Sequence, residues 1–173
     1  MIWDDMSKSD VTTKHNSTPA EWIEWRLLNT VFTDLGSSQP GDATLPGNGE
    51  PEQDPARKVT WNLWSVPGVQ PMLGRIFTQD EDNKGVRVAV ISYGLWQRRF
   101  GGSLDIIGRK IPLNDEAYEV IGVMPRGLFF MPARDIDVWV PASFPDWMRK
   151  SLWVYFRSAV RYRFGRSGTC STV

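Results

Sequence analysis

The chain has 173 residues, enough for one ordinary domain or two small subdomains that share a core. Lysine plus arginine and aspartate plus glutamate both number 20, so net charge gives no overall bias toward nucleic acid or anionic lipid. The single histidine, His15, and the single cysteine, Cys170, exclude a His/Cys metal cluster and an intrachain disulfide. They also argue against a Ser-His-Asp or Cys-His catalytic centre.

The N-terminal segment carries no targeting signal. Residues 1–16 are polar and expected to be disordered, and they lack the basic and apolar regions of a signal peptide. No window of about 18 apolar residues occurs anywhere, which predicts that this chain has no transmembrane helix. Taken alone, these features would keep the chain in the cytosol.

A helix is predicted from about residue 19 to 34. Pro19 suits the first helical position, and Glu21 lies three residues after Thr18, the spacing of a capping box. An apolar stripe at helical spacing comprises Trp22, Trp25, Leu28 and Phe32.

The segment from Gly36 to Pro55 is rich in Gly, Pro, Ser, Asp and Asn, which predicts a long connection with a short strand at residues 43–45. Neither GxGxxG nor GxxxxGK[ST] occurs in it, so its glycines do not indicate a phosphate site. Residues 58–64 then read as a strand, and residues 69–77 as a semi-extended segment.

Residues 78–85, TQDEDNKG, form a second capping box, from Thr78 to Glu81, and predict a short helical turn. The stretch from Asp80 also resembles the front of a calcium loop. However, Lys84 stands at position 5 and Ile91 at position 12, where oxygen ligands are required. We therefore predict a capped acidic turn rather than a calcium site.

A strand, helix and hairpin unit is predicted for residues 86–123. The apolar run 88–91 suits a buried strand, Ser92 suits a helix cap, and a helix follows to Phe100, ended by Gly101 and Gly102. Strands are expected at 109–113 and 118–123, joined by a turn at 114–116. The expected core of the domain contains Trp96, Phe100, Ile107, Ile111, Val120 and Trp139.

A last strand is predicted at residues 135–141, where Asp135 and Asp137 share one face and give only a weak indication of acid/base chemistry. From Trp147 onward the chain is basic and aromatic. This tail could bind single-stranded nucleic acid by charge and stacking, or it could be an edge strand followed by a disordered end. No residue is assigned a catalytic, cofactor-binding or metal-binding role.

Several segments, in order, resemble the MacB-like periplasmic core domain of ABC transporter permeases. They are WR, NTVF and DL within 25–35, GVQPMLGRIF at 68–77, ED at 81–82, VAVIS at 88–92, LWQRRFGG at 95–102, IIGR at 106–109, VIGVMP at 120–125 and DVWVP at 137–141. The resemblance covers about residues 17–147, which we expect to form the domain. Residues 148–173 are expected to lie outside the fold.

The resemblance implies an α+β fold of mixed small sheets and few helices. Its two intertwined subdomains would be βαβ-like porter units and a small mixed α/β unit. It implies a non-enzymatic extracytoplasmic domain, without cofactors, that couples ATP-driven change to substrate or partner proteins. Implied partners are transmembrane permease segments, a second permease copy, a cytoplasmic ATPase and a periplasmic adaptor. Because the family's transmembrane helices are missing here, a truncated permease is expected.

Two alternatives from other classes stay open at this point. One is a free-standing binding module whose basic aromatic tail contacts nucleic acid or an anionic surface. The other is an enzyme, which the residue inventory supports least. No nucleic-acid partner is expected under the leading interpretation, because the rest of the chain offers no basic face.

Overall fold

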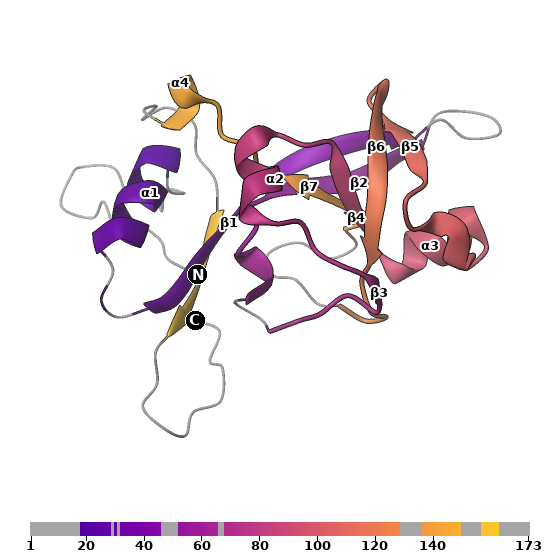
Figure 1. The fold of residues 1–173 in the computed structure, drawn as a ribbon, viewed down its shortest axis with the longest axis horizontal. Helices are drawn as coiled ribbons and strands as arrows, with labels where there is room; N and C mark the ends of the chain where they lie inside the picture. The colour runs from indigo at the N-terminus through magenta and orange to yellow at the C-terminus, as the bar shows by residue number, and fades with distance from the viewer. Residues whose placement is uncertain are drawn as a thin grey trace, which may run out of the picture. The chain divides into compact units, whose positions relative to one another are not determined.

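The computed structural model describes residues 18–28, 30, 32–45, 52–65, 68–128, 136–149 and 157–162. The chain divides into two compact units, and each unit is assembled from separate segments. Unit 1 comprises Met1–Gln39, Asn62–Val69 and Phe144–Val173, and unit 2 comprises Pro40–Trp61 and Gln70–Ser143. The predicted α+β class, with few helices and a mixed sheet, is confirmed (Figure 1).

Unit 2 is built on a mixed sheet in the order β3-β6-β4-β7-β2-β1, with β5 also paired to β6. Its strands are the second part of β1 (Phe32–Leu45), β2 (Glu52–Val59), β3 (Leu73–Gly74), β4 (Val88–Ile91), β5 (Lys110–Leu113), β6 (Glu116–Val123) and β7 (Val138–Pro141). Its helices are α2 (Gln79–Lys84), α3 (Tyr93–Phe100) and the 3-10 turn η2 (Leu104–Ile106). The β4–β6 and β2–β7 pairs are parallel.

Helix α3 begins and ends where the sequence predicts. The Ser92 hydroxyl accepts a hydrogen bond from the Leu95 N–H at 2.9 Å, and Gly101 adopts the left-handed conformation, with φ of 59°, that closes the helix. The hairpin from β5 to β6 is confirmed, although β6 begins at Glu116, two residues before the predicted strand. Its two-residue turn, Asn114 and Asp115, has positive φ at both positions, which matches the twist of the flanking strands.

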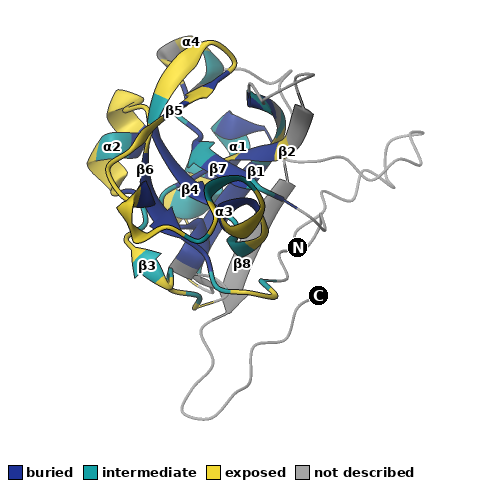
Figure 2. Cartoon of the chain, turned by 90° about the vertical axis from the view of Figure 1, so that its right-hand side faces the viewer, coloured by how far each residue is buried: buried dark blue, intermediate teal, exposed yellow. Residues whose placement is uncertain are grey.

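The core of unit 2 lies between α3 and one face of the sheet. Its buried members are Ala43, Leu45, Ala56, Ala89, Ile91, Leu95, Trp96, Ile106, Ile111, Leu113, Val120, Val123 and Val138. Phe100 packs against this cluster from a partly buried position. Figure 2 shows burial concentrated on the strands, while the helices and turns carry most of the exposed residues.

Two residues of the predicted core are placed differently. Ile107 is 38% exposed, because the 3-10 turn that precedes it directs Ile106 inward instead. Trp139 is buried but lies outside this cluster. Neighbouring residues of a strand point to opposite faces of a sheet, and on β7 it is Val138 that joins the cluster.

Unit 1 contains α1 (Pro19–Leu28), the first part of β1, η1 (Leu63–Ser65), α4 (Asp146–Arg149) and β8 (Arg157–Tyr162). The capping box at the start of α1 is confirmed: the Glu21 N–H donates to Thr18 Oγ1 at 3.3 Å, and the Thr18 N–H donates to the Glu21 carboxylate at 2.6 Å. The Trp22 indole is buried and donates to the Leu35 carbonyl oxygen at 3.0 Å.

The predicted end of the first helix, at residue 34, is wrong. Helix α1 ends at Leu28, and β1 begins at Phe32. The segment TVFT at 30–33 is β-branched and aromatic, which favours an extended backbone. Pairing with β8 and the full burial of Leu35 then stabilise the strand.

The predicted long connection at residues 36–55 is also wrong. Strand β1 continues through this region to Leu45, and β2 starts at Glu52, before the predicted position. The short strand expected at 43–45 is therefore the end of a longer one. Residues 60–64, expected to finish the next strand, instead form a turn and enter η1.

Strand β8 lies within the stretch expected to be outside the fold. It pairs antiparallel with β1, with Leu35 opposite Val160 and Ser38 opposite Arg157. The rest of the tail beyond Arg149 lies outside the described residues.

Candidate functional site

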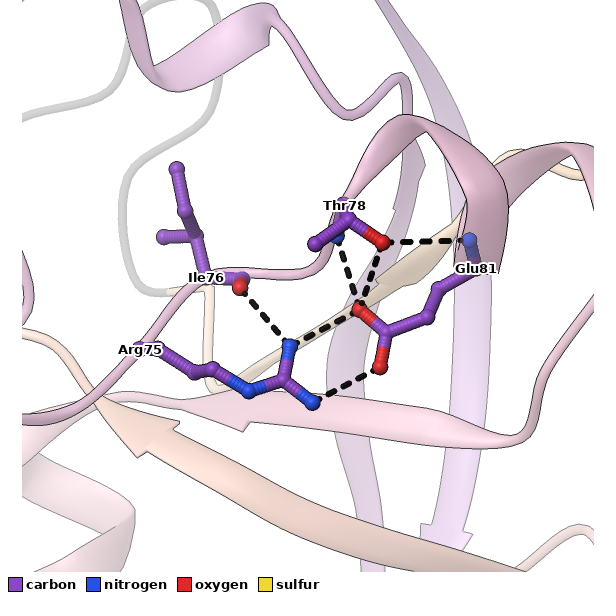
Figure 3. Close-up of polar contacts among 4 residues, drawn as sticks. All are labelled: Arg75, Ile76, Thr78 and Glu81. Carbon is purple, nitrogen blue, oxygen red and sulfur yellow. Dashed lines mark hydrogen bonds and ion pairs between the residues drawn. The ribbon is translucent and has the colours of Figure 1, made fainter.

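Figure 3 shows a polar network that fastens the start of α2 to the segment after β3. The Thr78 side chain caps the helix, accepting from the Glu81 N–H at 3.3 Å, and the Glu81 carboxylate accepts from the Thr78 N–H at 2.8 Å. Arg75 binds the same carboxylate through two nitrogens, at 2.7 and 2.8 Å. The predicted capping box is thus confirmed, and an arginine extends it.

This arrangement keeps Glu81 ionised. Hydrogen bonding from Arg75, helped by the Thr78 N–H, outweighs desolvation and lowers the pKa of Glu81 from 4.5 to about 2. The same pairing raises the pKa of Arg75. A carboxylate with such a low pKa is a permanent anion at neutral pH, so it suits an ion pair and not proton transfer.

Asp82, one residue later, is buried and satisfied by backbone donors. Its carboxylate accepts from the Trp61 N–H at 3.0 Å and from the Ser143 N–H at 2.8 Å. Lys84 lies outside that contact, bound to Asp80 at 2.6 Å. The two aspartates at the front of the calcium-like motif therefore serve different partners. Among the described residues, no group of three or more His, Cys, Asp or Glu side chains could hold a metal ion.

The sequence predicts that two carboxylates, Asp135 and Asp137, share one face of the last strand. Asp135 lies outside the described residues. Asp137 accepts a hydrogen bond from the Ser92 hydroxyl at 2.6 Å and pairs with Arg98 at 2.9 Å. This carboxylate therefore joins the segment before β7 to the N-cap and to the last turn of α3, which is a structural role.

Among the described residues of unit 1, the large apolar side chains that are exposed lie on α1 and α4. Leu27 and Leu28 are 79% and 71% exposed, and Trp147 is 65% exposed. The two helices are in contact, and Trp22 packs against Phe144 with ring centroids 5.8 Å apart. Leu27, Leu28 and Trp147 are thus exposed although the two helices contact each other.

Sequence reasoning missed this exposure, since it assigned Leu28 to the buried stripe. A signal was present in the spacing. Leu27 and Leu28 follow Trp22 by five and six residues, which places them about 140° and about 120° around the helix, so neither shares the face of Trp22. For Trp147, no signal in the sequence distinguished an exposed tryptophan from a buried one.

Within the described part of the chain, no helix is long and apolar enough to cross a membrane. Of the basic aromatic tail, β8 is the only described segment after α4, and it pairs with β1. The other arginines and aromatic residues of the tail lie outside the described residues.

The family model of the MacB-like periplasmic core domain matches residues 16–165. Comparison with curated proteins gives no match. The sequence-based resemblance is therefore confirmed by the family model, which extends further toward the C-terminus than the motifs do.

Solved structures share the fold at low identity. The periplasmic region of MacB from Actinobacillus actinomycetemcomitans is 13% identical, with a TM-score of 0.64 over 92% of this chain and 71% of that one. The extracellular domain of the noncanonic ABC-type transporter YknZ from Gram-positive bacteria is 18% identical, with a TM-score of 0.62 over 83% and 72%. A domain of a protein described as a permease, from Porphyromonas gingivalis, is 16% identical, with a TM-score of 0.67 over 88% and 71%.

Proposed function

The chain belongs to the MacB-like periplasmic core domain family, and from this premise we propose that it relays ATP-driven conformational change to a substrate or partner protein outside the cytoplasm. It is the periplasmic domain of a MacB-like ABC transporter permease. The relay, its partners and the absence of catalysis are our proposal. The partners would be the permease's membrane segments, a second permease copy, a cytoplasmic ATPase and a periplasmic adaptor.

The observation that carries this proposal is how three carboxylates of unit 2 are bound. Glu81 and Asp137 are bound by Arg75 and Arg98, and Asp82 accepts backbone N–H groups. Catalysis by acid and base needs groups poised to exchange protons near neutral pH. These side chains instead hold secondary-structure elements together, which suits a mechanical or binding role.

Firmly joined elements favour a relay. In unit 2, Arg75 and Glu81 bind α2 to the segment after β3, and Ser92 and Asp137 bind α3 to the segment before β7. A displacement applied to one of these elements is then passed on to its neighbour, because packed interiors deform little.

The exposed apolar residues of unit 1 are the proposed contact with a partner protein. Leu27, Leu28 and Trp147 expose large apolar surfaces to water, which costs free energy. Tryptophan is also enriched among the residues that dominate binding at protein interfaces. A partner that buries even two of them would gain several kcal/mol in hydrophobic transfer, at about 25 cal/mol per Å².

Site-specific photo-crosslinking in cells that contain the permease and its ATPase tests this function. A crosslinkable residue in place of Trp147 or Leu28 should capture transporter components in the membrane fraction, identified by mass spectrometry. Asp105, an exposed polar residue of unit 2, is the control position and should capture much less. Cross-links from Trp147 to nucleic acid or to cytosolic proteins would overturn the proposal in favour of the free-standing binding module.

A further inference from the structure

The chain leaves unit 2 for unit 1 just beyond the ends of two neighbouring parallel strands. Strand β2 ends at Val59, and its segment of unit 2 ends at Trp61; strand β7 ends at Pro141, and its segment ends at Ser143. Val59 and Pro141 are paired in register, and the Ala142 N–H donates to the Val59 carbonyl oxygen at 2.8 Å. The two segments by which the chain leaves unit 2, residues 60–61 and 142–143, therefore start side by side, and we call them the two exits.

One buried carboxylate binds both exits after the strand pairing ends. Asp82 accepts from the Trp61 N–H at 3.0 Å and from the Ser143 N–H at 2.8 Å, and it is 6% exposed. These donors lie 21 and 61 residues away in the sequence, so Asp82 joins three distant segments of unit 2. Hydrogen bonds to a charged acceptor in a buried position are roughly twice as strong as neutral ones.

The backbone at one exit is strained, so it needs neighbouring contacts that hold it in this conformation. Ser143 has a φ of 49°, in the left-handed region that disfavours residues with a Cβ atom. Gly85, at the C-terminus of α2, lies so close that an added Cβ would be 2.5 Å from Ser143 Oγ. Such a conformation persists only where neighbouring contacts impose it, and the bond from the Ser143 N–H to Asp82 is one of them.

Helix α2 is itself anchored and can serve as a fixed support. Arg75 and Glu81 fasten its first turn, and the N–H of Gly85 closes its last turn on the Asp82 and Glu81 carbonyl oxygens. We propose that Asp82 is a conformational clamp that binds the carboxyl ends of β2 and β7 to α2, so that the two exits from unit 2 move as one. This inference concerns unit 2 alone and does not depend on the proposed function.

Residue-resolved hydrogen exchange by NMR on the full chain tests the clamp. In Asp82→Asn, the side chain keeps one acceptor oxygen, so the Trp61 or the Ser143 amide should exchange at least about tenfold faster. In Asp82→Ala, both amides should do so, and the backbone chemical shifts of residue 143 should move away from left-handed values. Amides in the β5–β6 hairpin, such as Tyr118, should change less than about twofold.

Two further variants keep the test decisive if Asp82→Ala folds poorly. Asp80→Asn changes an exposed carboxylate of the same helix and should leave both amides protected. Gly85→Ala pushes against Ser143 while leaving Asp82 intact, and it should accelerate exchange at the Ser143 amide more than at the Trp61 amide. Unchanged protection in Asp82→Asn, or an equal loss of protection across the whole of unit 2, would overturn the clamp.

Discussion

Replacing Glu81 by glutamine isolates the ion pair that anchors α2. Glutamine keeps the size of the side chain but loses the charge bound by Arg75 and part of the acceptor capacity that holds the Thr78 N–H. A partly exposed Arg–carboxylate pair contributes up to about 1 kcal/mol, and helix caps contribute about 0.5–2 kcal/mol. With the Arg75 side chain 54% exposed, solvent screens the pair, so we expect a total loss of about 1–2 kcal/mol at pH 7.

The stability that Glu81 contributes should decrease as the pH falls, because its pKa is lowered in the folded chain. The pKa of Glu81 in the folded chain is about 2, below the ordinary value of 4.5 that the unfolded chain should have. The carboxylate therefore contributes its full stability above pH 4.5, and the contribution declines as the pH falls toward 2. The difference in unfolding free energy between the original chain and Glu81→Gln should shrink over the same interval.

Urea unfolding followed by tryptophan fluorescence at pH 7, 4 and 3 measures both effects. Asp80→Asn is the matched control, because Asp80 pairs with Lys84 on the same helix but is 74% exposed; we expect it to cost less than about 0.5 kcal/mol. An Arg75→Met, Glu81→Gln double-mutant cycle gives the coupling between the two side chains. A loss below about 0.3 kcal/mol at pH 7, or a loss that is the same at pH 3, would refute the reasoning.

Three other predictions concern packing and boundaries. Trp96→Ala should lower the free energy of unfolding by roughly 3–5 kcal/mol in a denaturant titration. The ring is buried in the core cluster, and its indole N–H donates to the Ser103 carbonyl oxygen at 2.8 Å. A loss below about 1 kcal/mol would mean that α3 does not bury this face. Asn114→Ala should cost about 1–2 kcal/mol, since Asn114 has a φ of 52° and its side chain accepts from the Thr44 N–H, whereas Asn114→Gly should cost less because it relieves the backbone. Ending the chain after Arg149 removes β8 and leaves β1 without that neighbour, so the unfolding midpoint should fall; an unchanged midpoint would place the end of the domain near residue 147, as the sequence alone predicts.

Helix caps and turns that are held by hydrogen bonds between nearby residues could be predicted from the sequence. The caps at Thr18, Thr78 and Ser92 each satisfy a helix N-terminus through a residue three positions away, so their signals are contained in four letters. The β5–β6 turn is also local. Its departure from the Asn-Gly pattern, with Asp115 in second place, did not obscure it, because Asp tolerates positive φ.

Strand β1 could not be predicted, because its stability comes from distant partners. Its sequence is rich in Gly, Pro and Ser, a composition typical of loops, yet it pairs with β2 and with β8. Packing explains why position 36 is a glycine, since a Cβ atom there would lie 2.6 Å from the Leu63 Cα atom. Only the fold reveals that a glycine read as a loop residue permits a close approach.

The role of Asp82 was hidden for the same reason. From the sequence, this carboxylate is one of three acidic residues in a helical turn, and the capping box explains only Glu81. Its two backbone donors come from segments 21 and 61 residues away, and no local pattern identifies them. The motif that resembles the family includes Glu81 and Asp82 together, but it does not show that one binds an arginine and the other binds the backbone.

The most direct test of the account follows the domain during ATP turnover. Hydrogen exchange with mass spectrometry would be measured on the permease that carries this domain, reconstituted with its ATPase in lipid vesicles, with and without ATP. We predict that ATP changes exchange within residues 18–162, and that a hydrolysis-deficient ATPase abolishes the cycle-dependent part of the change. Exchange across the domain that is identical in the presence and absence of ATP would contradict the proposed relay.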